Sequence, residues 1–213
     1  MTETAASPRR LLRLALLAGA VLLAAGCSSN GSSGKAVDAS KGPTAEDITA
    51  AFEMAGDAQD AEERGRIDEA IAKYRAALTQ YREFPAAWNN LGVVLMNEGR
   101  YLEAGECFAA ASDLAVLDPR PTYNLGLTWD RAGYMEEALR YYNRALDRDP
   151  RYLPALRGSI RTERLMGAGD ERTLERLKAA LLLEQSPRWR EWLELQRLRL
   201  ESEIRSEAVG AAQ

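Results

Sequence analysis

The chain has 213 residues, of which 46% are hydrophobic and 28% charged, with a formal net charge of −4. This length suits one ordinary domain or two small ones, and the mild acidity gives no reason to expect nucleic acid as a ligand. Histidine is absent, which removes the usual general base near neutral pH and the commonest metal ligand. Because phosphate-binding glycine loops, metal motifs and nucleophile–base pairs are also lacking in the sequence, we expect no enzyme, no catalytic residue and no metal site.

Residues 1–26 have the organisation of a cleaved secretory signal peptide. Three arginines precede an apolar stretch over 14–25, which is shorter than the about 20 residues that a transmembrane helix needs. The run LAAGC at 23–27 resembles the lipobox of bacterial lipoproteins. That resemblance implies that Cys27 carries a covalent diacylglycerol and acyl chains such as palmitate, and we expect no cofactor. The alternative is an ordinary signal peptide with an incidental cysteine.

The segment that follows indicates how the chain would be attached. Residues 27–43 are rich in Gly and Ser and are predicted to form a flexible tether behind the lipidated Cys27. Ser28, rather than Asp, follows the cysteine, which resembles the sorting pattern of outer-membrane lipoproteins. We therefore expect a bacterial cell-envelope location, lipid-anchored at the outer membrane and facing the periplasm.

Fixed residue types then recur every 34 residues. The pair Leu91-Gly92 recurs as Leu125-Gly126, and the pattern G-x4-A-x3-aromatic-x2-A occurs three times in one register, starting at Gly65, Gly99 and Gly133. Each of these glycines is predicted to adopt a left-handed conformation in the turn after a helix. Abundant Ala, Leu, Arg and Glu, with few β-branched runs, favour helices throughout.

The period and residue types resemble the tetratricopeptide repeat (TPR), a pair of antiparallel helices that stacks into a right-handed superhelix. The resemblance implies an all-α domain over 44–206 with a C-terminal capping helix. Its parts would be units at about 51–84, 85–118 and 119–152, a degenerate unit at 153–185, the capping helix at 187–206 and a disordered tail at 207–213. Asp57 and Ala58 replace Leu-Gly in the first unit, so we expect its first helix to be displaced or loosely packed.

In this family, partners usually bind a concave groove lined by the first helix of each pair. The resemblance places ten residues there: Asn89, Asn90, Val93, Asn97, Tyr123, Asn124, Leu127, Arg131, Arg157 and Arg161. Asn90 and Asn124 share a repeat position, where an amide can bond the backbone of an extended peptide. The alternative is that these asparagines belong to the structural pattern and contact only water or a neighbouring helix.

The spacing of Arg157, Arg161 and Arg164 places them on one helix face. They could form a basic end of the groove that receives carboxylates; the alternative is a solvated face paired with Glu163 and Asp130. Cys107 is expected to be a partly buried small hydrophobe, because nothing near it in the sequence indicates redox chemistry.

These features predict a membrane-anchored TPR scaffold for protein–protein interaction in the bacterial cell envelope. Its partner would be an unidentified component of the envelope machinery, and by analogy of size and layout with known TPR lipoproteins we place it in pilus or secretion-machine assembly. The alternative is a self-assembling structural lipoprotein that forms a homodimer, with the first unit and the tryptophan-containing last helix exchanged between subunits.

Overall fold

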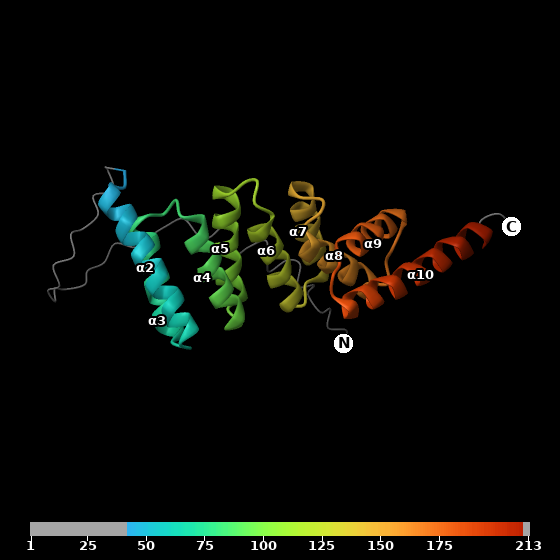
Figure 1. The fold of residues 1–213 in the computed structure, drawn as a ribbon, viewed down its shortest axis with the longest axis horizontal. Coiled ribbons are helices and arrows are strands. Elements are labelled where there is room, and N and C mark those ends of the chain that lie inside the picture. The colour runs from blue at the N-terminus through green and yellow to red at the C-terminus, as the bar shows by residue number, and fades with distance from the viewer. Residues whose placement is uncertain (1–41, 211–213) are drawn as a thin grey trace, which may run out of the picture. The chain divides into compact units, whose positions relative to one another are not determined.

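The computed structural model describes residues 42–210, which belong to one compact unit. The predicted signal peptide, Cys27 and nearly all of the predicted tether lie outside this range. The described residues form α-helices and no strand, as expected (Figure 1). The helices are α2 (Ala45–Glu63), α3 (Ile67–Gln80), α4 (Pro85–Asn97), α5 (Tyr101–Leu114), α6 (Pro119–Arg131), α7 (Met135–Arg148), α8 (Leu153–Leu165), α9 (Glu171–Leu183) and α10 (Pro187–Gly210).

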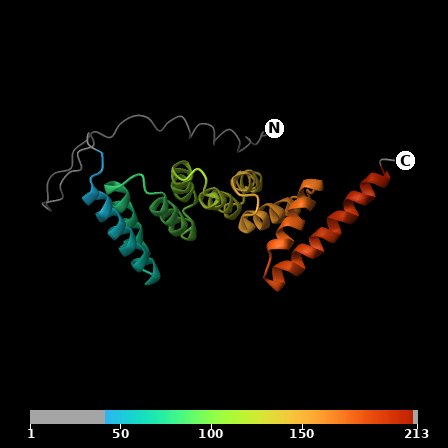
Figure 2. The same ribbon diagram turned by 45° about the horizontal axis from the view of Figure 1, so that its top comes forward.

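Consecutive helices form pairs, which we call units 1 to 4: α2/α3, α4/α5, α6/α7 and α8/α9. The first helix of each pair is called helix A and the second helix B. Each unit packs on the next, and α10 packs on α9 (Figures 1 and 2). Within the described range, none of these helices is long and apolar enough to cross a membrane.

A left-handed glycine ends helix A in every unit. The φ angles are 72° at Gly65, 73° at Gly99, 87° at Gly133 and 68° at Gly167. The residue after each glycine donates its backbone N–H to the carbonyl five residues earlier, as Arg100 does to Leu95 at 2.9 Å. Such a turn satisfies carbonyls at the helix end and reverses the chain. The left-handed conformation predicted at the first three of these glycines is thereby confirmed.

An aromatic ring of helix B lies directly on the backbone of helix A. A Cβ atom added to Gly92 would lie 2.7 Å from Cε1 of Phe108, and one added to Gly126 would lie 2.6 Å from Cδ1 of Tyr142. Both rings are fully buried. Glycine is therefore required at these two positions because no side chain fits beneath the ring.

Helix α2 corrects the expectation of a loose first unit. Ala51, Ala58 and Ala61 are fully buried against the rest of the unit. Ala58 occupies the register of Gly92, and its methyl group is small enough for close helix packing. Thr44 and a carboxylate at the third helical position form a capping box that starts the helix.

The C-terminal end also differs from the prediction. Helix α10 continues to Gly210, past the predicted capping-helix end at 206 and into the stretch predicted as a disordered tail. Its start at Pro187 agrees with the sequence, as does the capping box of Asp170 at the beginning of α9.

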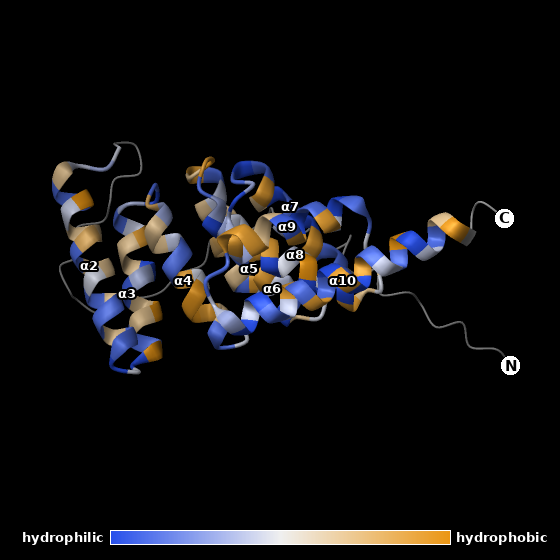
Figure 3. Ribbon diagram, turned by 45° about the vertical axis from the view of Figure 1, so that its right-hand side comes forward, coloured by the Kyte–Doolittle hydropathy of each residue, from blue (hydrophilic) through white to orange (hydrophobic). Residues whose placement is uncertain are grey.

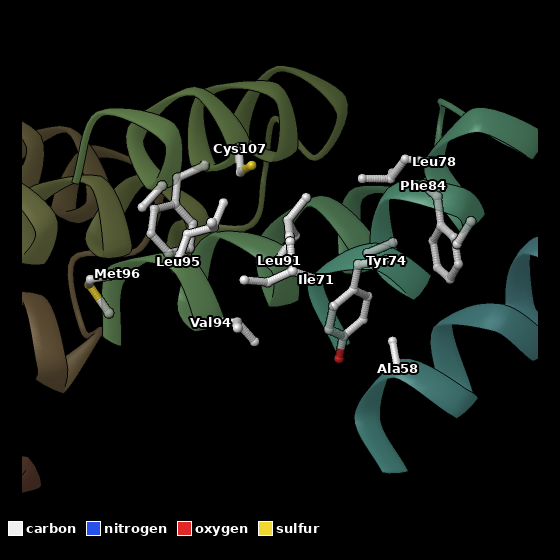
Figure 4. Packing of buried hydrophobic residues seen from close by; sticks show 14 of the residues in the cluster. Ala58, Ile71, Tyr74, Leu78, Phe84, Leu91, Val94, Leu95, Met96 and Cys107 are labelled. Carbon is white, nitrogen blue, oxygen red and sulfur yellow. The ribbon is translucent and has the colours of Figure 1, made fainter. Parts of the chain in front are cut away.

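The helices carry hydrophobic and hydrophilic residues together, and the hydrophobic ones form the core of the stack (Figure 3). One cluster joins α2 to α6, and part of it is seen in Figure 4. Cys107 lies in this cluster and is buried, and burial raises the pKa of its thiol to about 11. The thiol therefore stays protonated near neutral pH, in agreement with an inert packing role.

Gly126→Ala tests the requirement for a bare backbone under the ring. The added methyl group would clash with Tyr142, so we expect the free energy of unfolding to fall by about 1–3 kcal/mol. Gly105→Ala is the matched control, because its Cβ would lie 4.0 Å from Leu125 and should stabilise the helix by up to about 1 kcal/mol. Chemical denaturation followed by circular dichroism measures both, and equal effects of the two substitutions would contradict the packing argument.

Candidate functional site

The helices A of units 2 to 4 present a common surface, which we call the A-helix face. Helix α6 contacts both α4 and α8 along it. The ten predicted groove residues all lie on these three helices and none is buried: Asn97 and Arg131 are exposed, and the other eight are partly exposed. The structure thus places the predicted residues on neighbouring helices with their side chains accessible to a partner.

Amide groups link α4 to α6 across this face. The Nδ2 group of Asn124 donates a hydrogen bond to Oδ1 of Asn89 at 2.9 Å, and the Nδ2 group of Asn89 donates a longer one to Oδ1 of Asn90 at 3.4 Å. Arg131 donates to Asn97 at 2.9 Å. The side-chain amide of Asn124 therefore bonds a neighbouring helix, which is the alternative to peptide binding that we considered for the repeated asparagines.

Apolar and aromatic groups fill the middle of the face. Val93 and Leu127 are half-buried and pack against the first core cluster. The ring of Tyr123 lies 5.7 Å from that of Tyr142 and 5.6 Å from that of Tyr152, between centroids. Burial raises the pKa of Tyr123, so its hydroxyl is neutral near pH 7. This region offers apolar contact area rather than charge.

The predicted basic end is already neutralised within the molecule. Arg161 donates to Asp130, as the ion-pair alternative anticipated, while Arg164 donates to Glu203 of α10 at 2.7 and 2.8 Å. Glu163 pairs with Arg176 at 2.7 Å instead of with the arginines of its own helix. These ion pairs join α8 to α6 and to α10, so the charges of Arg161 and Arg164 are balanced within the molecule.

Arg157 makes the most buried of these contacts. It donates to Glu184 through Nε at 2.7 Å and Nη2 at 2.6 Å, and its guanidinium lies 4.9 Å from the Trp189 ring centroid. Burial would raise the pKa of Glu184, but hydrogen bonds from Arg157 and from the Ser186 backbone keep it below its usual value. Glu184 lies just after α9, at the end of the degenerate unit and at no position of the repeat motif, so the pattern offered no signal for this pair.

Two pockets adjoin the A-helix face. One, of about 610 Å³, lies between α8 and α10 and combines arginines with indole rings; it is lined by Arg161, Arg164, Leu165, Arg188, Trp189, Trp192 and Gln196. The other, of about 470 Å³, lies between units 1 and 2 and is acidic; it is lined by Gln59, Glu62, Glu63, Tyr74, Asn90 and Val93. Sequence reasoning found Asn90 and Val93 of the second pocket but missed its acidic half, because unit 1 departs from the repeat pattern.

The site shows no metal-binding arrangement: within residues 42–210, no three Cys, Asp or Glu side chains come together as metal ligands would. The A-helix face offers a partner amide groups, apolar side chains and two pockets, of which one combines arginines with indole rings and the other is acidic. Such a surface can hold an extended chain by side-chain and backbone hydrogen bonds.

Comparison with known proteins agrees with this arrangement. A tetratricopeptide-repeat family model matches residues 56–115 and 97–152. BBSome complex member BBS4 from Bos taurus is 31% identical over 87 residues, which cover 41% of this chain and 17% of that protein. The Xenopus tropicalis protein is 38% identical over 60 residues, covering 28% and 12%. The chain thus spans less than a fifth of the length of these relatives.

Solved structures share the fold at low sequence identity. The first TPR of Spaghetti (RPAP3), bound to an HSP90 peptide, superposes with a TM-score of 0.54 at 17% identity, covering 57% of this chain and 96% of that one. MamA gives a TM-score of 0.56 at 19% identity, covering 64% and 74%. An O-GlcNAc transferase from Thermobaculum terrenum gives 0.55 at 22% identity, covering 65% and 26%.

The 34-residue period, the antiparallel helix pairs with their left-handed glycine turns, and these matches lead to one assignment. Residues 56–152 of this chain are tetratricopeptide repeats.

Proposed function

We propose that the chain is a membrane-anchored, non-catalytic scaffold that binds a partner protein through the A-helix face. The observation that carries the proposal is the accessible row of amide and apolar side chains on α4 and α6, flanked by two pockets. TPR folds serve as protein–protein interaction scaffolds, and the TPR of RPAP3 holds a peptide of another protein. The same use of this face fits its mixed polar and apolar character.

The location proposed here rests on the sequence of the first 43 residues. The signal-like segment, the lipobox-like run ending at Cys27 and the Gly/Ser-rich stretch favour a lipid anchor in the bacterial envelope, at the outer membrane on its periplasmic side. A scaffold held close to a membrane would suit the assembly of a pilus or a secretion machine, and that is the process we propose. The partner would then be a component of this machinery.

Affinity capture from envelope extract tests the A-helix face. The baits are the full chain and a variant with Asn90→Ala, Asn124→Ala and Arg131→Ala, which removes polar side chains from this face and whose folding is checked by circular dichroism. We expect a protein retained by the first bait and lost from the second. The control bait carries Leu102→Ser and Leu117→Ser, which alter exposed leucines of helix B and its following loop. Equal retention by all three baits would move the binding site away from the A-helix face.

Cys27→Ser tests the anchor. The hydroxyl cannot form the thioether to diacylglycerol, so the variant should lose incorporation of labelled palmitate and leave the membrane fraction. A Cys107→Ser variant is the matched control, because Cys107 is buried in the core and should leave both signals unchanged. Labelling of the Cys27→Ser protein at the level of the unaltered chain would remove the anchor proposal.

A homodimer is the second candidate, and exposed leucines of α10 favour it. Leu195 and Leu198 are 45% and 56% exposed on this terminal helix. If they form an interface, light scattering of the full chain in mild detergent should give twice the monomer mass, and Leu195→Glu with Leu198→Glu should return it to one. A monomer mass at every concentration of the unaltered chain would exclude this candidate.

A further inference from the structure

Three side-chain positions meet at each junction between consecutive units. They are the last turn of helix A, the middle of helix B, and the middle of helix A in the next unit. At the junction of units 3 and 4 these positions hold Asp130, Tyr142 and Arg161. The Tyr142 hydroxyl donates to Asp130 Oδ2 at 3.2 Å, and Arg161 donates to the same oxygen. This junction is complete, because the largely buried acid has both a phenol and a cation as partners.

The junction of units 2 and 3 is apolar at the same positions. Counting back 34 residues gives Met96, Phe108 and Leu127. Met96 and Phe108 are buried members of the first core cluster, and Leu127 packs against that cluster. With no acid present, this junction needs no cation.

The junction of units 1 and 2 resembles the junction of units 3 and 4, except that it lacks the cation. The acid and the phenol return as Glu62 and Tyr74, whereas Val93 stands where Arg161 stands two units later. Valine is short and neutral, and the space it leaves belongs to the acidic pocket of about 470 Å³ between these units. Glu62, Tyr74 and Val93 all line that pocket.

The polar groups of this pocket have no internal cation. Tyr74 is fully buried, and its hydroxyl lies beside the side chains of Glu62 and Asn90, but neither contact has the geometry of a normal hydrogen bond. In Figure 4 this hydroxyl points away from the hydrophobic cluster. Among the described residues, the basic side chains of α3 and of the turn before it pair with other acids, and none forms a salt bridge with Glu62 or Glu63; these pairs join Arg64 to Asp60, Arg66 to Glu69, Lys73 to Asp57 and Glu69, and Arg75 to Glu103.

The electrostatics agree with a missing cation. Burial raises the pKa of Glu62, the nearby Tyr74 hydroxyl lowers it, and the neighbouring charge of Glu63 raises it again, so that the pKa lies above its usual value. A cation placed beside Glu62 would reverse that shift. The pocket therefore favours a positively charged group over a neutral one.

We propose that the pocket between units 1 and 2 binds an arginine side chain of the partner protein, in the place that Arg161 fills between units 3 and 4. This deepens the proposed function and rests on it, since Asn90 and Val93 belong to the A-helix face. The guanidinium donates to the Glu62 carboxylate, with Tyr74 beside it as Tyr142 is beside Asp130. Glu63, Gln59 and Asn90 supply further acceptors at the rim.

Fluorescence anisotropy with the full chain at low salt tests the recognition of arginine. The probe is a fluorescein-labelled Gly-Gly-Arg-Gly-Gly peptide, compared with peptides that carry citrulline or lysine instead. Citrulline has nearly the shape of arginine without its charge, so we expect its peptide to bind about tenfold or more weakly. Added salt should weaken the arginine peptide. Equal binding of the arginine and citrulline peptides, or no saturable binding of either, would overturn the proposal; stronger binding of lysine than arginine would overturn the choice of arginine.

Substitutions locate the site. Glu62→Gln should weaken the arginine peptide about tenfold, whereas Glu106→Gln, which removes one charge from an exposed position of α5, should leave it unchanged. Val93→Arg should abolish peptide binding by filling the pocket from within. Val93→Arg should also raise the midpoint temperature of thermal unfolding, because the new arginine would pair with Glu62 as Arg161 pairs with Asp130. This gain should vanish when Glu62→Gln is added. Leu127→Arg should lower the midpoint, since Met96 and Phe108 offer no acid there.

Failure of this inference can be told apart from failure of the proposed function. If capture through the A-helix face succeeds but the partner binds Val93→Arg and Glu62→Gln baits as well as the unaltered chain, the scaffold stands and the arginine pocket is wrong. If the arginine peptide binds in a Glu62-dependent manner while capture finds no partner on the A-helix face, the pocket is supported and the scaffold proposal is wrong. If Val93→Arg does not fold, Glu62→Gln alone decides.

Discussion

The contact between an aromatic ring on helix B and the bare backbone of helix A sets the geometry of the stack. Phe108 rests on Gly92, and Tyr142 rests on Gly126 and also on Gly158 of the next unit, whose added Cβ would lie 2.8 Å from the ring. A ring held from both sides has one position, and the helices around it have little freedom. The close approach also brings the last turn of helix A near the ring edge. This is why corresponding side chains of different units meet in corresponding ways and can be compared as equivalent positions.

The junctions between units differ in whether polar groups occupy these equivalent positions and in how those groups are satisfied. Between units 3 and 4 the acid, phenol and guanidinium come from the chain itself, and between units 2 and 3 all three groups are apolar. Units 1 and 2 keep the acid and the phenol without the guanidinium. A buried polar group without a partner is costly unless something satisfies it. The sequence difference of a single position, valine against arginine, therefore changes a closed junction into an open one.

The repeat pattern predicted the fold well because glycine and aromatic spacing reflects the main packing contact directly. It underestimated α2, since Ala58 looks like a departure from the Leu-Gly pattern although its methyl group still allows close packing. It also missed the ion pairs of the C-terminal part. Arg157 with Glu184 and Arg164 with Glu203 join residues 27 and 39 positions apart, which no 34-residue register brings together. The acidic half of the pocket was missed because unit 1 departs from the repeat pattern, and only the structure shows that Glu62 and Tyr74 line one pocket with Val93.

The left-handed glycine turns and the contacts between neighbouring helices have a mechanical consequence. In the described residues, helix contacts concentrate between elements that are close in the chain, so a force applied to the two ends loads the unit interfaces in series. A stack of this kind yields one unit at a time, and each released unit of 34 residues lengthens the chain by up to roughly 110–120 Å. Units still closed by their own ion pairs keep their structure while weaker ones open. A protein built in this way can remain attached to two objects that move apart, extending under load without losing all of its folded surface.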